Sequence, residues 1–408
     1  MKSPPQDHLI TPYFSYADDT EYSIQPIRWL LRPISVWPVS SIKERILSAV
    51  LLIVCVFLIA GTLVPCALAI FLDQNKDVET KVRDFGPLSN WVLASLKYCS
   101  LLSHVGDIRR CLEHVDADWR AVTKHEDREM MLRNAKIGRF IALFAALFMH
   151  SGVFSYSIFQ AMTMNESVLG DNASMHSLPF AFYDKILDTT TSPTYEIVFI
   201  MQFLSTFVVN SVAVSTVSLI AVFVMHACGQ IKILISLLEN FVDETSEKWE
   251  NSTQGKYAVI VEHHLRVLSF VSYIDKITNI ICLVEVMGCT LHMCLLGYYC
   301  IMDWTQGDKE SIVSYVIILI SVTFNIFIFC YIGEILSEQC GQIGDTAYMT
   351  NWYLLRRNNA VGFVLIILKS NVVVKITAGK MIELSLSTFG DVIKSAVAYL
   401  NIFRTLVT

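Results

Sequence analysis

Charged residues are scarce in this chain. Asp, Glu, Lys and Arg make up only 17% of its 408 residues, whereas 54% are hydrophobic and the mean hydropathy is +0.50. So few charged groups cannot cover a folded chain of this length in water, which excludes one or two soluble domains. The formal net charge of −6 is dispersed along the chain and gives no indication of a nucleic-acid partner. The composition therefore predicts a membrane protein.

Motifs for catalysis and metal binding are also absent from the sequence. His263-His264 is not part of an H-E-x-x-H motif, and Gly379-Lys380 lacks the upstream glycine and the following Ser or Thr of a phosphate loop. The eleven cysteines include no C-x-x-C pair, and the segment 162–193 contains no cysteine. We therefore expect no enzyme activity, no cofactor, no disulfide framework and no zinc site.

Seven stretches approach the length of about 20 apolar residues that a helix needs to cross a bilayer. We predict transmembrane helices at 46–71, 88–105, 137–159, 197–225, 277–302, 312–332 and 385–408. The first forty residues have no apolar core, so the first span is expected to direct membrane insertion. The second span contains Lys97. If this segment did not cross the membrane, the predicted orientation of every later span would be reversed. The fold class predicted is an all-α membrane protein with seven transmembrane helices.

The distribution of basic residues predicts the orientation of these spans. Basic residues precede the first span at Arg28, Arg32, Lys43 and Arg45. Seven more lie between 109 and 136, whereas the loop after the third span holds only Lys185. Since cytoplasmic loops are enriched in Lys and Arg, the N-terminus is expected in the cytoplasm and the C-terminus outside. This orientation is the inverse of a G-protein-coupled receptor.

The loop after the third span carries two N-glycosylation sequons. They begin at Asn165 and Asn172, within the segment 160–195. Sequons are used only on the lumenal side of the membrane, which agrees with the orientation given by the basic residues. We predict glycosylation at both asparagines.

The segments 226–276 and 333–380 combine apolar and charged residues at helical spacing. This pattern predicts helices that continue from the membrane into the cytoplasm. The predicted organisation is a cytoplasmic segment at 1–45, four spans at 46–225 with an extracellular loop at 160–195, a cytoplasmic helical extension at 226–276, two spans at 277–332, cytoplasmic anchor helices at 333–380, and the last span at 381–408. The apolar faces of the extensions could pack within one chain or between subunits. We favour contact between subunits, because a helix pair in water has little other cover.

The last span differs from the others because it contains Asp391, Lys394 and Arg404, which a lipid-facing helix would not tolerate. The helical period places one polar, two small and two apolar side chains on one side, in that order: Asp391, Ser395, Ala398, Ile402 and Leu406. A graded stripe of this kind suits a helix that borders water and ends in a constriction. The alternative is a buried bundle helix whose charges pair internally.

The C-terminal residues carry a resemblance to a known family. The run 385–389 (SLSTF), Tyr399 and the preceding Ala378-Gly379-Lys380 resemble the C-terminal signature of insect odorant receptors. The sister gustatory receptors end in Thr-Tyr and Gln-Phe patterns, where this chain has Thr388-Phe389 and Ile402-Phe403. The comparison favours the olfactory branch and leaves a gustatory-type channel as the alternative.

The resemblance implies an odorant-gated, nonselective cation channel in the plasma membrane of olfactory sensory neurons. It implies that the last helix lines a pore shared by four subunits, that cytosolic anchor helices meet around the central axis, and that an odorant-tuned chain works with an olfactory co-receptor. It also places a hydrophobic gate at Ile402 and Leu406. Thr405 is a candidate lip residue, and Asp391 could attract cations or pair with Lys394. A secondary transporter is a further alternative, although no internal repeat supports it.

The expected ligand is a small, volatile organic molecule. Its site should be a dry pocket lined by aromatic and aliphatic groups with a few polar partners. The resemblance places it in the outer half of the bundle, between the second and sixth spans. Candidate lining residues are Trp91, Ser95, His150, Phe154, Tyr156, Phe199, Phe203, Thr206 and Tyr315. Each is also compatible with core packing, and His150 with a neutral, hydrogen-bonded histidine. Glu285 and His292 face the same way on the fifth span and require partners on neighbouring helices.

Overall fold

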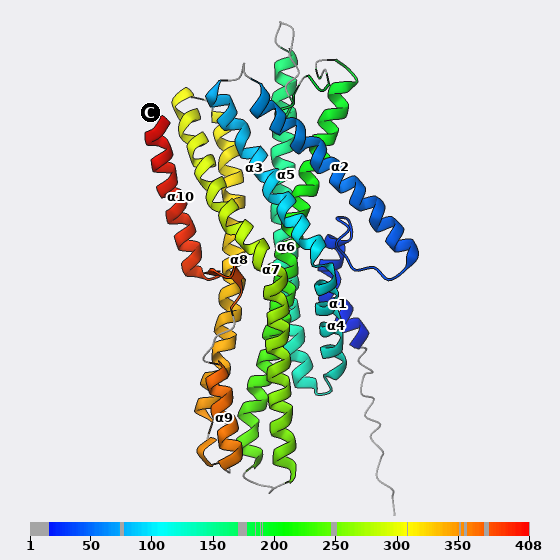
Figure 1. Cartoon of the computed structure of the whole chain (residues 1–408), viewed down its shortest axis with the longest axis vertical. Helices are drawn as coiled ribbons and strands as arrows, with labels where there is room; N and C mark the ends of the chain where they lie inside the picture. Colours follow the sequence, from blue (N-terminus) through cyan, green and yellow to red (C-terminus); the bar gives the residue numbers. More distant parts are fainter. Residues whose placement is uncertain are drawn as a thin grey trace, which may run out of the picture.

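The computed structural model describes residues 16–73, 77–169, 178–183, 185–187, 189, 191–245, 251–307, 309–350, 352–354, 357–370 and 375–407. Within this part of the chain the structure is almost entirely helical, and its long helices run side by side along the longest axis (Figure 1). The helices are α1 (Tyr16–Leu31), α2 (Ile42–Leu72), α3 (Val78–Ser103), α4 (Val105–Ala121), α5 (His125–Leu169), α6 (Thr194–Thr245), α7 (Asn251–Gln306), α8 (Lys309–Met349), the 3-10 turn η1 (Trp352–Leu354), α9 (Arg357–Ser370) and α10 (Leu386–Val407). A two-stranded hairpin of β1 (Thr377–Ala378) and β2 (Ile382–Glu383) precedes α10.

Five of the described helices contain segments long and apolar enough to cross a membrane. These segments are Ile42–Leu72, His125–Ser155, Thr194–Phe241, Lys256–Gln306 and Lys309–Met349. They lie on α2, α5, α6, α7 and α8, the helices that contain the first, third, fourth, fifth and sixth predicted spans. The second and seventh lie on α3 and α10, which have 26 and 22 residues and are not among these five helices. Their assignment as spans stays a prediction.

Four helices, α5 to α8, continue far beyond the length of a membrane span, and α5 has 45 residues. α7 has 56 residues, which corresponds to roughly 84 Å at 1.5 Å per residue, against about 30 Å for the hydrocarbon layer. α6 and α8 have 52 and 41 residues, and α9 packs beside them at the lower end of the bundle (Figure 1). There the ring of Phe363 on α9 lies 5.4 Å from the ring of Phe241 on α6. The extensions thus bury apolar faces against one another within the chain.

A buried carboxylate joins three helices near the middle of the bundle. Asp118 of α4 is only 3% exposed, and it accepts hydrogen bonds from Arg266 Nε of α7 at 2.6 Å and His226 Nε2 of α6 at 2.9 Å. His114 Nδ1 on the same helix lies 3.2 Å away. Burial by itself would raise the pKa of Asp118, but the hydrogen bonds from the two histidines outweigh it and hold this pKa well below its ordinary value.

We predict that Asp118→Ala lowers the stability of the protein by about 2–3 kcal/mol, since it leaves the buried His226, the half-buried His114 and the half-buried Arg266 without their shared acceptor. The matched control is Asp116→Ala on the same helix, which removes only the more exposed pair with Arg120 and should cost less than about 1 kcal/mol. Thermal unfolding of the purified protein in detergent measures both changes.

The contribution of Asp118 to stability should depend on pH. Because the folded-state pKa of Asp118 is depressed, its stabilisation is present above the ordinary pKa of an aspartate and is lost as the pH falls through the folded value. The wild-type protein and Asp118→Ala should therefore converge in melting temperature in acid. Equal melting temperatures of the Asp118 and Asp116 variants at neutral pH would contradict the structural role of Asp118.

The hairpin before α10 is fixed to α7 by a small polar network. The backbone N–H and the hydroxyl of Thr377 donate to Asp275 Oδ1 at 2.8 and 2.9 Å, and Asn279 Nδ2 donates to Thr377 Oγ1 at 2.9 Å. Gly379 adopts a φ of +63°, which its lack of a Cβ permits, and its N–H donates to the carbonyl of Asn279 at 3.1 Å. These contacts tie the residues just before α10 to α7.

Candidate functional site

A cavity of about 400 Å³ lies between the helices of the bundle. Its lining comes from α3, α5, α6, α7 and α8, together with Pro179 and Phe180 of the segment between α5 and α6. Cavities of roughly 300–1,000 Å³ lined mainly by apolar groups are typical small-molecule sites. The five helices are those that contain the second to sixth predicted spans.

The structure brings three of the predicted ligand-binding residues to this cavity. Trp91, Thr206 and Tyr315 belong to its lining. Ser95, His150, Phe154, Phe199 and Phe203 lie on the same helices but are not among the lining residues, and the side chain of Tyr156 lies outside the described residues. The helices predicted from the sequence to surround the ligand all line the cavity, whereas only three of the predicted side chains do.

The predicted residues outside the lining have other contacts. Ser95 Oγ donates to the carbonyl of Trp91 at 2.7 Å. His150 Nδ1 lies 3.0 Å from the carbonyl of Ala146, and its Nε2 lies 3.4 Å from Ser211 Oγ. Phe154 is 48% exposed on the outside of the bundle. His150 is therefore hydrogen-bonded between α5 and α6, one of the two interpretations given by the sequence.

Trp91 is held between α6 and the segment that follows α5. Its indole N–H donates to Ser205 Oγ at 2.8 Å, and its ring lies 4.6 Å from the ring of Phe180 in an edge-on arrangement. The backbone N–H and carbonyl of Phe180 both pair with the side-chain amide of Gln202 at 3.2 Å. Gln202 is only 1% exposed, so it fixes Phe180 against the cavity. Sequence reasoning missed Phe180 and Gln202, because their pairing is not visible in local spacing.

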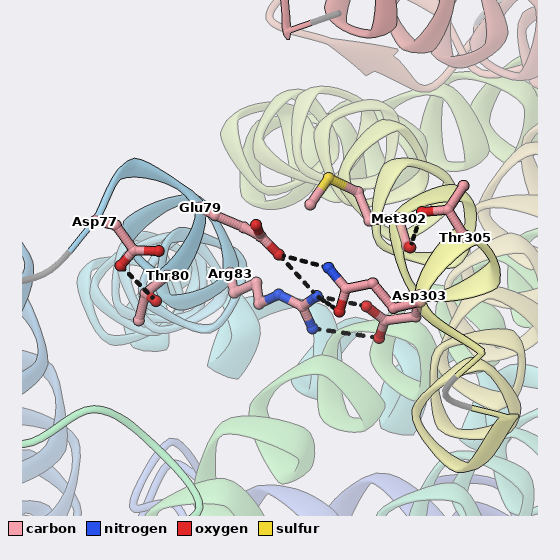
Figure 2. Close-up of polar contacts among 8 residues, drawn as sticks. Asp77, Glu79, Thr80, Arg83, Met302, Asp303 and Thr305 are labelled. Carbon is pink, nitrogen blue, oxygen red and sulfur yellow. Dashed lines mark hydrogen bonds and ion pairs between the residues drawn. The ribbon is translucent and has the colours of Figure 1, made fainter.

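A charged network links α3 and α7 at the outer rim of the cavity. Arg83 contacts Asp303 through both guanidinium ends, at 2.5 and 3.3 Å, and Glu79 at 3.2 Å (Figure 2). Gln306 Nε2 donates to Glu79 Oε1 at 3.0 Å. Asp303 is completely buried, and Arg83 also lines the cavity. A bidentate arginine–carboxylate pair therefore sets the distance between the two helices at this rim.

The inner part of the lining contains a buried ion pair. Lys97 Nζ of α3 lies 3.0 Å from Glu285 Oε2 of α7, and both side chains are at most 10% exposed. Asn325 Nδ2 of α8 and Cys289 Sγ also donate to Glu285 Oε1. His292 Nε2 lies 3.1 Å from Ser89 Oγ of α3. The partners that the sequence required for Glu285 and His292 are thus supplied by α3 and α8.

We predict that Lys97→Met and Glu285→Gln each destabilise the protein by about 3–5 kcal/mol, because each leaves the opposite charge buried without its partner. The double variant Lys97→Met/Glu285→Gln should recover most of this loss, since it removes both charges and keeps an acceptor for Asn325. Melting temperatures of the four proteins in detergent measure the coupling. Strictly additive losses would exclude an energetically important pair.

α10 packs along one side only. Val392 and Ala396 are buried, and the ring of Phe403 lies 4.8 Å from that of Tyr298 on α7. A Cβ at Gly297 would lie 2.9 Å from a methyl carbon of Leu400, so this glycine permits the close approach of α10 to α7. One side of α10 is thereby attached to the bundle.

The predicted pore residues lie on the other side of α10 or at its edge. Asp391, Ala398, Ile402 and Thr405 are exposed in the single chain, Ser395 is half-buried, and the side chain of Leu406 lies outside the described residues. Asp391 pairs with Lys394 at 3.3 Å, and both side chains are mostly exposed.

Of the predicted glycosylation sites, Asn172 lies outside the described residues, and Asn165 falls near the end of α5 with its side chain undescribed.

The long apolar helices and the internal cavity define a helical membrane protein of several spans. The chain belongs to the odorant receptor family, because the profile of the 7tm Odorant receptor family matches residues 77–397. This match confirms the resemblance drawn from its C-terminal residues.

Curated insect relatives support the family assignment. Odorant receptor 10 of Aedes albopictus is 23% identical over 230 residues, which cover 56% of this chain and 60% of that protein. Odorant receptor 82a of Drosophila melanogaster is 25% identical over 215 residues, which cover 53% of this chain and 54% of that protein. The chain thus spans little more than half the length of these two relatives. Both are named as receptors, and neither as an enzyme.

Solved structures share the fold over nearly the whole chain. The insect olfactory receptor OR5 from Machilis hrabei matches with a TM-score of 0.79 at 15% identity, covering 95% of this chain and 98% of that one. The same receptor in complex with eugenol matches with a TM-score of 0.77 at 14% identity, covering 96% and 99%. At this level of identity the likeness establishes the all-helical fold.

Proposed function

We propose that the chain is the odorant-tuned subunit of an odorant-gated, nonselective cation channel that assembles with an olfactory co-receptor. The observation that carries this proposal is a ligand-sized cavity lying next to a half-covered, polar-to-apolar helix. The family assignment and the structural likeness to OR5, which was solved with eugenol, support it. In the complete assembly of four subunits, α10 and the corresponding helices of the other subunits surround the pore, with Ile402 and Leu406 at its gate.

Our proposal places the N-terminus in the cytoplasm and the C-terminus outside, in the plasma membrane of olfactory sensory neurons. The distribution of basic residues supports this orientation. Large apolar side chains are exposed on α2 and α5, such as Phe57 at 66% and Leu147 at 73%, and these suit contact with membrane lipid. α6 to α8 then extend into the cytoplasm as part of the anchor. Epitope tags at both ends would distinguish this topology from that of a G-protein-coupled receptor.

α7 provides a direct connection between ligand and pore. Leu295, Leu296 and Tyr299 line the cavity, whereas Gly297 and Tyr298 between them contact α10. A ligand that binds more tightly to one arrangement of α7 therefore shifts the equilibrium between two positions of α10. Binding and gating are thus coupled through adjacent residues of a single helix.

The pore assignment predicts which positions of α10 react from water. Ala398→Cys and Ile402→Cys, expressed with the co-receptor, should react with a charged thiol reagent during odorant pulses, and the reaction should reduce the current. Ala396→Cys is the matched control, because Ala396 is 5% exposed and faces the bundle. Current recordings before and after the reagent measure the effect. Equal reactivity at all three positions, or none at 398 and 402 in both states, would contradict the pore assignment.

The ligand assignment predicts a change in the size of active odorants. Val153→Trp places a larger side chain in the cavity lining, so concentration–response curves should shift toward shorter homologues of an active odorant. Leu147→Trp on the same helix is 73% exposed and should leave the size preference unchanged. Recordings use cells without usable G-protein signalling, with and without the co-receptor. An identical shift for both variants would argue against ligand binding in this cavity.

A further inference from the structure

The cavity contains a buried hydrogen-bond acceptor without a partner. Asn325 is 7% exposed and belongs to the cavity lining. Its Nδ2 donates to Glu285 Oε1, whereas its Oδ1 has no hydrogen-bond partner within the described part of the chain. A carboxylate can only accept hydrogen bonds, so Glu285 fixes the orientation of this amide. Asn325 therefore presents an acceptor that a ligand with a donor group can satisfy.

A second amide of the lining also has an unsatisfied atom. Asn210 of α6 lines the same cavity, and its buried Nδ2 has no partner among the described residues. Asn210 and Asn325 each lie about sixteen residues after the start of their helices, α6 and α8. These two helices start at the same end of the bundle (Figure 1), and both amides belong to the lining of one cavity. The cavity thus offers a donor and an acceptor.

The charges of the site restrict the ligand to a neutral molecule. Of the four charged residues in the lining, Lys97 and Glu285 neutralise each other at 3.0 Å, and Arg83 is paired with Asp303. The fourth, Asp84, is next to Arg83 in the chain and is only partly buried. An ammonium or carboxylate ligand would bring an additional charge into this buried region without a free counter-charge. The ligand group should therefore donate to Asn325, accept from Asn210 and carry no charge. The smallest group that does all three is a hydroxyl.

We propose that the cavity selects neutral odorants that carry a hydroxyl group, either alcohols or phenols. The ligand O–H donates to Asn325 Oδ1, and its oxygen accepts from Asn210 Nδ2. The hydrocarbon part lies against the apolar lining, which includes Met149, Val153 and Ile318. Aldehydes, ketones, esters and ethers accept but do not donate, and so leave Asn325 Oδ1 unpaired. This inference rests on the proposed odorant-receptor function.

The test compares isomers that differ only in the hydroxyl group. Octanol is paired with heptyl methyl ether, and 2-phenylethanol with benzyl methyl ether, so each pair has the same atoms. The full-length chain is expressed with the co-receptor, and currents are recorded over a range of concentrations. At least one alcohol should activate at a concentration about tenfold or more below that of its ether, because a site built for a hydroxyl rejects an analogue without it. Octylamine, as the charged comparison, should be weaker than octanol.

Variants connect the preference to the two asparagines. Asn210→Leu and Asn325→Leu should each reduce the alcohol-to-ether ratio to within about threefold. Asn325→Leu also removes a hydrogen bond to Glu285, so surface expression is measured in parallel. Asn210 Nδ2 has no protein partner to lose, so Asn210→Leu tests the inference even where the other variant fails to fold. The control is Thr323→Val on α8, which lies outside the lining and should retain the wild-type ratio.

The outcomes separate this inference from the channel proposal. Currents with no alcohol preference, an advantage for octylamine, or an equal loss for alcohol and ether in Asn210→Leu would overturn the hydroxyl assignment and leave the channel intact. If no probe elicits current, ligand-induced changes in melting temperature of the purified protein decide. Greater stabilisation by the alcohols than by their ethers then supports the hydroxyl assignment while the channel proposal fails, and the absence of a difference overturns the assignment.

Discussion

The need to pair buried polar groups inside an apolar bundle determines much of this structure. Lys97 and Glu285 are the clearest case, because neither charge could remain alone between membrane helices. Their contact joins α3 to α7, and Asn325 brings α8 to the same carboxylate. The three helices that meet there also line the cavity. The polarity of α3, which sets it apart from the five long apolar helices, is therefore the property that positions it in the bundle.

The elements that could be predicted from the sequence are those encoded locally. The apolar runs on α2, α5, α6, α7 and α8 are visible as hydropathy, and the structure places each on a long helix. The family assignment rests on a short C-terminal motif, and the profile match confirms it. The choice of helices around the ligand corresponds to the cavity as well, although the role of that cavity is a proposal.

Side-chain contacts between distant segments could not be predicted in the same way. Asp303 lies 220 residues after Arg83, and no periodicity connects them. The same holds for Asp118, whose partners come from two other helices. On an isolated helix, Phe154 and Phe199 are as suitable for a pocket as Trp91, and only packing decides which one faces inward. Single-sequence reasoning identifies chemically suitable residues but does not provide their rotation within the bundle.

The unbroken course of α7 from the cavity to the far end of the bundle has a mechanical consequence. A continuous helix of 56 residues resists bending, so it transmits a tilt along its whole length. If the contact of Arg266 with Asp118 acts as a fulcrum, a tilt of about three degrees displaces the Asn251 end of α7, roughly 22 Å away, by about 1 Å. A change in the cavity lining that tilts α7 would thereby shift the far end of the bundle laterally, where α7 packs beside α6 and α9.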